Sequence, residues 1–470
     1  MKYDVVIIGS GLGGLVCGSL LAREGKKVLV LERQAQPGGC MQSYQRGGLS
    51  FDTGFHYVGG LAEGQPLHGI FSRLGLMQLP WVRLDADGFD RVTIGHQTFP
   101  LAEGYDNFAN TLGEYFPQEK NGLKQYVELM RHLPQLEEIG TVNAYDWLKS
   151  LFHDPLLINV LSGSAIKMEL RRESMPLFTF AHGMSSYIAS SWRLRGGGHL
   201  IVNKLVDDIH RLGGKVLCHV DVNKLVERDG RIVAARSTKG NSYEGSIFIS
   251  DVHPQVTFGW LDDSKLIKNT FRRRINAMEN STGIFTVSLV LKQGVLPYFN
   301  HNKYVYRKPN VWTFAEDVGG IGGVMVSCRV PQWGDYARQI DLLTPVAWKL
   351  FEPWADTTVG HRGDIYEMLK SHLADECIRL AERVIPGLGA MVEKQYTSTP
   401  LTYRDYTLTP CGSAYGVRKD CRNLLMTMLS PRTPIPNLLL TGQNLILHGV
   451  EGVTKTAVLT CEEALARIEN

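Results

Sequence analysis

The stretch from Lys2 to Arg33, KYDVVIIGSGLGGLVCGSLLAREGKKVLVLER, decides which fold the chain is expected to adopt. Its β-branched run from Val5 to Ile8 predicts a buried parallel strand. Apolar residues then recur at near-helical spacing from Gly14 to Glu24, and Gly25 is placed to end that helix. A second apolar run, Val28 to Leu31, predicts the next strand. This order of strand, helix and strand indicates a βαβ unit.

The turn between the first strand and the helix has the pattern G-x-G-x-x-G, from Gly9 to Gly14. Gly9 allows a tight turn, Gly11 lets backbone amides approach a pyrophosphate, and Gly14 lets the helix pack close to the strand. The helix N-terminus offers unpaired N–H groups and a positive dipole end to phosphates. Glu32, which ends the second strand, is placed to accept hydrogen bonds from a ribose hydroxyl. We therefore expect a dinucleotide site that contains Gly9, Gly11, Gly13, Gly14 and Glu32, and the acid at the ribose position argues against a 2′-phosphate.

Two further motifs follow at short spacing, a glycine pair at Gly38 and Gly39 and the stretch F-D-T-G that ends at Gly54. The combination E-R-x-x-x-x-G-G plus F-D-x-G resembles the opening of FAD-dependent amine oxidases, phytoene and other carotenoid desaturases, and retinol saturases. The resemblance implies that the cofactor is FAD and that these three glycines lie beside the flavin and its phosphates. It also implies that Arg33 is the basic residue that follows the ribose acid.

The segment from Arg195 to Asp251 contains a glycine run, a helix that ends at Gly213-Gly214, and four short strands, over 215–219, 222–227, 231–237 and 247–251. Its order resembles the segment of the same superfamily that returns to the dinucleotide domain. The resemblance implies that the strand holding Val220 or Asp221 passes the adenine. Asp251, which ends the last strand of the segment, is interpreted as a cap for the following turn.

The closing segment repeats the order of strand, glycine turn and helix, with a buried strand at 438–440 and a helix expected over 454–468. The pattern L-L-L-T-G-Q-N-x-x-x-H-G-x-x-G-V resembles the closing motif of the retinol-saturase and phytoene-desaturase branch. We expect this segment to return to the first strand and cover the flavin. The residues that the resemblance places at the cofactor are Gly442, Gln443 and Val450.

The predicted fold class is α/β, with a Rossmann-like FAD-binding domain, built from a parallel sheet plus a β-meander, interleaved with an α+β substrate-cap domain. A chain of 470 residues is too long for one compact core, so two domains are the default expectation. The FAD-binding domain is predicted over 1–75, 191–265 and 406–470, and the substrate domain over 76–190 and 266–405.

The composition excludes several classes of protein. The formal net charge of +3 is too small to suggest a nucleic-acid partner, and no long basic run supports one. The 8 cysteines form no CxxC pattern, which is typical of reduced, structural thiols, and no spacing suggests a metal site. No signal peptide and no spanning apolar run were found, so we expect a cytoplasmic protein that contacts membranes peripherally.

In flavoproteins the cofactor performs the redox chemistry, while the protein binds and orients the cofactor and the substrate and provides the electrostatic environment. His448 and Glu451 flank the expected flavin turn and are candidate proton donors, although Glu451 would equally suit the backbone amides at the start of the last helix. His56 and Tyr57 follow the flavin-lining strand, and Tyr187 lies near the end of the first cap segment. These three are candidate substrate residues, and the alternative for His56 and Tyr57 is that they fill the seam between the domains.

The predicted function is FAD-dependent saturation or desaturation of carbon–carbon bonds in an apolar polyene or isoprenoid, by hydride transfer at flavin N5. Isomerisation of such a substrate is a third outcome, and the electron donor or acceptor is unknown. One alternative is a flavin amine oxidase, although no aromatic pair typical of that class stands out between Tyr403 and Gly416. The other is a non-redox protein of the same fold that binds prenyl groups or lipids.

Several stretches carry expectations that bear on the cap domain. The apolar group from Leu151 to Leu161 is expected to form its core, within a helix over 145–161. Residues 342–354 combine tryptophans, aliphatic residues and Lys349, which suits a helix lying in a membrane interface; the alternative is again core. Strands are expected over 304–315 and 324–329, with the glycine run 319–323 as the turn between them.

Overall fold

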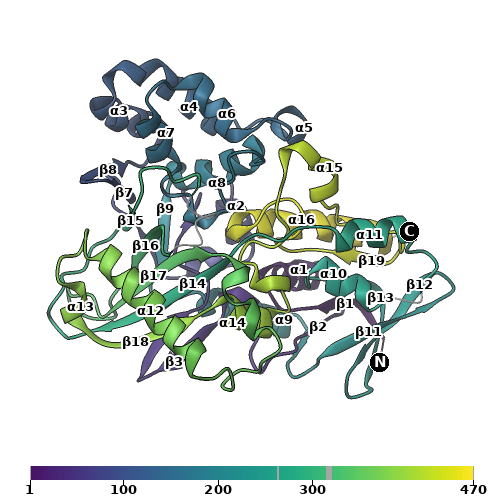
Figure 1. Ribbon diagram of the computed structural model, residues 1–470. Coiled ribbons are helices and arrows are strands. Elements are labelled where there is room, and N and C mark those ends of the chain that lie inside the picture. Colours follow the sequence, from purple (N-terminus) through teal and green to yellow (C-terminus); the bar gives the residue numbers. More distant parts are fainter. Residues whose placement is uncertain (1, 262–263, 314–319, 469–470) are drawn as a thin grey trace.

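The computed structural model describes residues 2–261, 264–313 and 320–468. Two large sheets organise this part of the chain (Figure 1). In Figure 1 the dinucleotide sheet lies at the right with both termini, the second sheet lies at the lower left, and a lobe of helices covers the top.

The dinucleotide sheet is parallel at its centre and continues into an antiparallel meander. Its strand order is β10-β2-β1-β13-β12-β11, and β19 pairs with the free side of β13. The bounds of these strands are β1 Tyr3–Ile8, β2 Val28–Leu31, β10 Lys215–Leu217, β11 Val222–Arg228, β12 Arg231–Ser237, β13 Ser242–Ser250 and β19 Leu438–Leu440. The predicted parallel sheet plus meander is therefore confirmed.

Successive residues of the central strands serve opposite faces of this sheet, because side chains alternate along a strand. Val5 and Ile7 of β1 pack against three helices, α1 (Leu12–Arg23), α9 (His199–Arg211) and α16 (Gly449–Ile468). Val6 and Ile8 pack on the other side with the meander and with α10 (Pro254–Gly259) and α11 (Asn269–Asn276). With both faces covered, β1 reads as a continuous apolar run rather than as an alternating one.

The second sheet has the order β18-β14-β17-β16-β15-β7-β8, and its neighbours are antiparallel except for the parallel pair β15 and β7. Helix α12 (Asp364–Ala381) packs on one face of it. The bounds of its strands are β7 Asp90–Ile94, β8 Gln97–Leu101, β14 Gly283–Leu291, β15 Asn302–Tyr306, β16 Gly323–Cys328, β17 Gln339–Val346 and β18 Val392–Ser398.

A lobe of helices shares one large core with the other face of this sheet. Its members are α3 Tyr105–Tyr115, α4 Lys120–Arg131, α5 Leu136–Ile139, α6 Ala144–Leu151, α7 Pro155–Ser162 and α8 Leu177–Ala189. The apolar group 151–161 lies in this core, as expected, but the single helix predicted over 145–161 is wrong. Asp154 caps α7 and Pro155 begins it, so the backbone breaks between α6 and α7.

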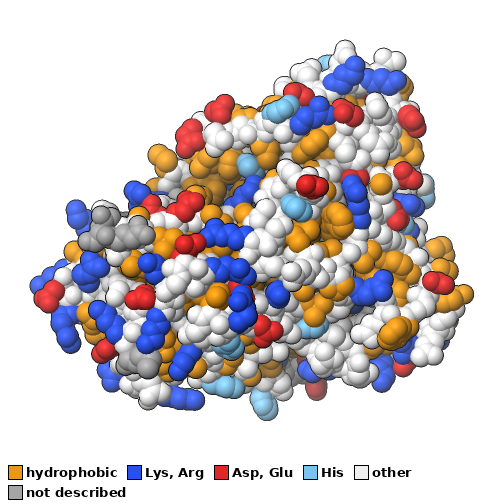
Figure 2. All heavy atoms as spheres, turned by 180° about the vertical axis from the view of Figure 1, so that it is seen from behind, with side chains coloured by type: hydrophobic (Ala, Val, Ile, Leu, Met, Phe, Trp, Pro, Cys, Tyr) orange, Lys and Arg blue, Asp and Glu red, His pale blue; other side chains and the backbone are white. Residues whose placement is uncertain are grey.

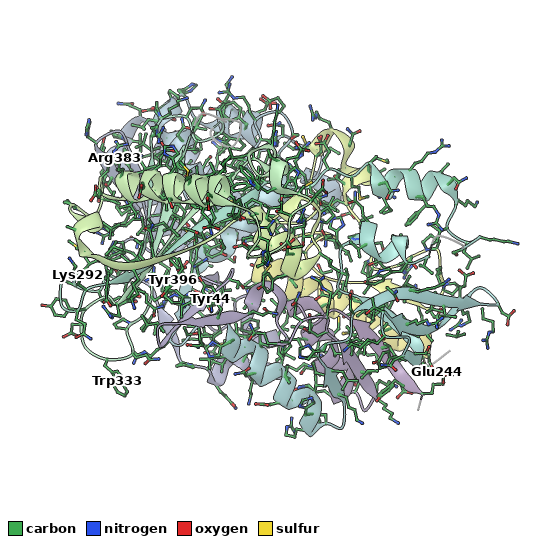
Figure 3. All side chains as sticks on the ribbon, turned by 60° about the horizontal axis from the view of Figure 1, so that its bottom comes forward. Tyr44, Glu244, Lys292, Trp333, Arg383 and Tyr396 are labelled. Atoms are coloured by element: carbon green, nitrogen blue, oxygen red, sulfur yellow. The ribbon has the colours of Figure 1, made fainter. Side chains whose placement is uncertain are left out.

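Smaller elements connect these parts. The hairpin β3–β4 packs on the second sheet, because Phe51 of β4 contacts Tyr44 of β3 and Tyr396 of β18, and these two tyrosines lie close together in Figure 3. The remaining elements are β3 Ser43–Arg46, β4 Leu49–Asp52, β5 Val58–Gly59, β6 Trp81–Arg83, β9 Ser191–Leu194, α2 His68–Arg73, α13 Leu388–Met391, α14 Pro400–Thr407 and α15 Leu424–Thr427.

The fold class is thus confirmed, while the predicted boundaries between the domain segments stay predictions. Two local expectations were wrong, namely the length of the strand over 304–315 and the start of the last helix. The strand expected over 304–315 ends at Tyr306, and Ala315 lies outside the described residues. The glycine run 319–323 also begins outside them, although β15 and β16 on either side do form an antiparallel pair. Helix α16 begins at Gly449, before the predicted start at 454, so Val450 and Glu451 belong to its first turn.

The expectation of an interfacial helix over 342–354 was also wrong. Its first part is strand β17, whose side chains are buried on both faces of the second sheet. Two short 3-10 turns follow, and in them Phe351 is fully buried while Trp348 and Trp354 pack partly on the same core. By contrast, Trp333 is 89% exposed and points away from the body of the molecule (Figure 3).

The surface charges, the cysteines and the search for membrane-spanning helices and metal sites complete the description of the fold. Figure 2 shows basic and acidic side chains interspersed with apolar ones on the face that it presents. No helix among the described residues is long and apolar enough to cross a membrane. All eight cysteines lie in the described part of the chain and are free thiols. The same part contains no group of three or more His, Cys, Asp or Glu residues arranged to hold a metal ion.

Candidate functional site

A cavity of about 320 Å³ runs from the glycine turn of the dinucleotide sheet to the apolar core of the second sheet. At one end it is lined by the turn after β1, by Glu32 and by the loop before β11. At the other end it is lined by Ile284, Met325 and Leu343 of β14, β16 and β17. The closing segment, with Gln443, His448 and Val450, also lines it. One cavity therefore joins an anion-binding turn to an apolar chamber.

The glycine turn is built for close approach. Gly9 adopts a φ of +95°, which side chains rarely tolerate, and Gly14 packs directly on its carbonyl oxygen. A Cβ at Gly13 would lie 3.0 Å from the backbone of Gly442, so the closing segment touches the first turn. The predicted return of this segment in space is confirmed.

Glu32 lies at the carboxyl end of β2 and is almost fully buried. It accepts hydrogen bonds from the backbone N–H of Ser10 at 3.1 Å and of Gln34 at 2.7 Å, and the Ser10 hydroxyl donates to it as well. The backbone N–H of Val220 donates to the Glu32 carbonyl at 2.8 Å, which places the β10–β11 loop beside this carboxylate. The acid is thus fixed where the cavity begins, in the position expected for a ribose partner.

The other predicted cofactor residues lie around the same end. Gly39 and Gly54 line the cavity, and the N–H of Gly38 donates to the Ser10 carbonyl at 2.9 Å. Arg33 also lines it, but its guanidinium donates to the backbone carbonyl of Asp405. Three of the predicted glycines pack around the glycine turn but do not line the cavity: Gly14, Gly38 and Gly442.

Asp251 is a site residue whose placement the sequence did not reveal. Its carboxylate lies inside the glycine turn, where an oxygen would be 2.5 Å from a Cβ on Gly11 and 2.6 Å from one on Gly13. Burial raises the pKa of Asp251 to about 7; hydrogen bonds from the N–H groups of Gly14 and Gly11 oppose that rise, and nearby Glu32 adds to it. The expected cap for the following turn therefore caps α1 instead, beside the position where phosphates would bind.

The three candidate substrate residues all line the cavity. Tyr57 and Tyr187 are neighbours, with ring centroids 4.6 Å apart, and both line the wall. His56 lies 3.8 Å from Asp341, and burial lowers its pKa, so its imidazole is neutral at pH 7. His56 lines this cavity and a neighbouring polar one of about 480 Å³.

The two candidate proton donors differ in their surroundings. His448 lines the cavity, with Nε2 at 3.2 Å from the carbonyl oxygen of Lys167, and burial lowers its pKa to about 4. Its neutral ring therefore donates Nε2–H to that carbonyl. Glu451 does not line the main cavity but an adjoining one of about 50 Å³, where it pairs with Lys455 at 2.5 Å.

Two tyrosines from the 403–416 stretch also line the cavity, where no aromatic pair was identified from the sequence. The Tyr403 hydroxyl donates to the carbonyl of Thr53 at 2.8 Å, and the Tyr415 hydroxyl donates to that of Ile166. Lys167 is a further wall residue that sequence reasoning missed. For the aromatic pair, the one signal in the sequence was the presence of two tyrosines, Tyr403 and Tyr415, within that stretch.

Comparisons with known proteins agree with this geometry. Residues 7–74 match the family described as NAD(P)-binding Rossmann-like domain. The whole chain is 27% identical to the all-trans-retinol 13,14-reductase of Macaca fascicularis, over 99% of this chain and 86% of that protein. The chain is a homologue of the retinol 13,14-reductases. It is also 25% identical to prolycopene isomerase 1 of an Oncidium hybrid cultivar, over 99% of this chain and 84% of that one.

The predicted resemblance to retinol saturases and the carotenoid branch is therefore confirmed, and so is the predicted enzyme class, oxidoreductase. Solved structures confirm the fold. An oxidoreductase from Methanosarcina mazei superposes with a TM-score of 0.67 at 17% identity, covering 98% of this chain and 100% of that one. Wild-type putrescine oxidase superposes with a TM-score of 0.67 at 14% identity, covering 99% of each chain.

Proposed function

We propose that this homologue of the retinol 13,14-reductases binds FAD and acts on carbon–carbon double bonds of an apolar polyene or isoprenoid, by reduction, desaturation or isomerisation. The observation that carries the proposal is the single cavity that joins the Gly9–Gly14 turn and Glu32 to the apolar chamber. The names of the relatives, a retinol 13,14-reductase and a prolycopene isomerase, support a polyene as substrate.

The residues present fit a dinucleotide cofactor. Gly11 and Gly13 carry no side chains at the start of α1, and both line the cavity, which would let phosphates approach the backbone amides. The half-neutral Asp251 offers less repulsion to phosphates than an ordinary carboxylate would. Bound FAD would supply two-electron redox chemistry to the substrate chamber. The chain's own part is to hold the ribose at Glu32, exclude water with apolar walls and manage protons.

Purification tests the proposal directly. The protein should be yellow, and denaturation should release FAD that chromatography identifies. The reduced protein, mixed without oxygen with all-trans-retinol or a poly-cis lycopene, should give a saturated or an isomerised polyene. Formation of hydrogen peroxide from putrescine or cyclohexylamine would instead favour the amine-oxidase alternative. The presence of the Tyr403 and Tyr415 rings in the cavity wall is the observation that supports this alternative. Polyene binding by a protein without flavin would favour the non-redox alternative.

Replacing Glu32 with alanine should weaken FAD by about 1.5–3 kcal/mol, because a hydrogen bond from the ribose to a charged acceptor is lost. That loss corresponds to a roughly 10- to 150-fold higher Kd. The matched control is Glu24→Ala at the end of the same βαβ helix, since Glu24 is 44% exposed and pairs only with Arg73 at 2.5 Å among the partners found. Equal flavin content and equal FAD affinity in the two variants would show that Glu32 does not bind the ribose.

A further inference from the structure

Lys167 lines the cavity, and the printed contacts of its ammonium group place it beside Asp90 and Tyr57, close to the second sheet that forms the apolar end. Only 12% of its side chain is exposed. Its Nζ lies 3.1 Å from the Tyr57 hydroxyl and 3.7 Å from the centroid of the Tyr187 ring. A buried ammonium is costly unless its charge is balanced, so its position beside a polyene chamber calls for an explanation.

The charge of Lys167 is balanced by Asp90, a fully buried carboxylate 4.0 Å away. The Tyr57 hydroxyl links the two groups, because it donates to Asp90 at 2.9 Å and accepts from Lys167. Tyr304 donates to the same hydroxyl at 2.8 Å, and Asn302 donates to Asp90 at 2.8 Å. This network fixes the ammonium at one point of the cavity wall.

Lys167 also lines the small cavity of about 50 Å³ that adjoins the main cavity and contains Glu451 in its wall. Three buried polar atoms around that cavity have no hydrogen-bond partner among the described residues: Glu451 Oε2, His182 Nδ1 and Thr179 Oγ1. A cavity of this size holds at least one water, and such atoms are the partners that a buried water needs. Lys167 therefore lines both the main cavity and a small cavity whose walls include polar side chains that could hold a water.

We propose that Lys167 Nζ is the proton donor to the polyene, and that the small cavity beside Glu451 holds the water that returns a proton to it. This role rests on the proposed function. Reduction of a C=C bond needs a hydride on one carbon, which a bound reduced flavin would supply, and a proton on the other. The Nζ–H bond breaks, the new C–H bond forms as the π bond is consumed, and Lys167 is left as a neutral amine. That amine then takes a proton from the water while Glu451 passes a proton from solvent to the same water, so that no hydroxide is left.

Burial lowers the pKa of Lys167 to about 8, against the opposing effect of Asp90. The ammonium therefore predominates at pH 7 but releases its proton more readily than an ordinary lysine does. The titratable groups that face it are Tyr57, Tyr187, Asp90, Tyr304, His182 and Glu451, with His448 bonded to its carbonyl. The donor form is present below the pKa and is lost as pH rises through about 8.

The test compares Lys167→Met with Lys394→Met, an exposed lysine on β18. Four quantities are measured: flavin content, the Kd of all-trans-retinol and of lycopene without turnover, the single-turnover rate at which the polyene oxidises the reduced protein, and the pH dependence of that rate. We expect Lys167→Met to keep its flavin and bind both polyenes within a few fold of wild type. Its single-turnover rate should fall by about 10²- to 10⁴-fold, and the decline above pH 8 that is expected of wild type should be absent.

Two further variants separate the parts of the proposal. Lys167→Arg keeps a cation in place but does not release its proton at these pH values, so it should also bind polyene and lose the rate. This variant decides the matter if Lys167→Met does not fold. With dithionite supplied to reduce the flavin again after each turnover, Glu451→Gln should leave the first turnover intact and slow later ones, because only the return of the proton is impaired.

Other outcomes overturn the proposal in distinct ways. Equal rates and pH profiles for Lys167→Met and Lys394→Met would remove Lys167 from the reaction. Weaker binding of retinol alone, with the rate retained, would make Lys167 an anchor for a hydroxyl group. Wild-type protein that lacks flavin or converts no polyene would overturn the proposed function itself, and that result is visible before any variant is made.

Discussion

Replacing Gly14 with alanine is expected to cost about 3 kcal/mol or more of unfolding free energy and to abolish FAD retention. The added Cβ would collide with the carbonyl oxygen of Gly9, which is backbone and therefore has little freedom to move aside. Either α1 shifts away from β1 or the turn loses its shape. Both changes move the amides at the helix N-terminus that would face the phosphates.

The matched control is Gly69→Ala in α2, where a Cβ would meet no heavy atom within 4 Å. Alanine favours helix over glycine, so this variant should gain about 0.4–1 kcal/mol. Denaturant unfolding measures both free energies, and the absorbance of the purified proteins measures flavin content. A Gly14→Ala protein with wild-type flavin content and stability would contradict the close packing of turn and helix.

Replacing Phe351 with alanine is expected to lower the free energy of unfolding by about 3–5 kcal/mol. Phe351 is fully buried in the core between the second sheet and α12, and the deletion leaves a cavity there. Its neighbour Leu350 is 37% exposed, so Leu350→Ala should cost less than about 1 kcal/mol.

Comparison of the two unfolding curves also decides between the two interpretations of residues 342–354. If this stretch docked on membranes through Phe351, the alanine variant would keep its stability and lose binding to vesicles. The buried position predicts the opposite, namely a destabilised protein whose affinity for vesicles does not depend on this side chain.

The dinucleotide unit was predictable because its signals are local. The run Val5–Ile8, the glycine turn and Glu32 lie within one short stretch, and each has a direct consequence for backbone geometry. The closing segment was recognised in the same way, from a glycine between a strand and a helix. The break at Asp154-Pro155 had an equally local signal, a helix cap followed by proline at the first helical position.

Residues 342–354 show why other parts could not be predicted. A continuous apolar run is compatible with a strand buried on both faces or with an apolar helix, and periodicity alone does not separate them. The deciding fact is that both faces of β17 are covered, by α12 on one side and the helical lobe on the other.

Lys167 and Asp251 were missed for a related reason. A lysine is ordinarily a surface residue, and this one is buried only because Tyr57, 110 residues earlier, and Asp90 meet it in space. Asp251 enters the glycine turn because β13 pairs with β1 in parallel, so that both strands end at the same edge. Such placements follow from how distant segments assemble, which single-sequence patterns do not record.

The assembly of the first and last segments has a consequence for the making of the protein. Cys17 of α1 contacts Thr441 at 3.7 Å, although 424 residues separate the two. At a synthesis rate of about 5–20 residues per second, the ribosome delivers Thr441 roughly 20 to 85 seconds after Cys17. Until then α1 lacks its neighbour α16, β13 lacks β19, and the apolar side of the nascent βαβ unit stays uncovered. The apolar surface of the first βαβ unit is therefore exposed longest during synthesis, and the wall of the cavity is complete only when the closing segment has been made.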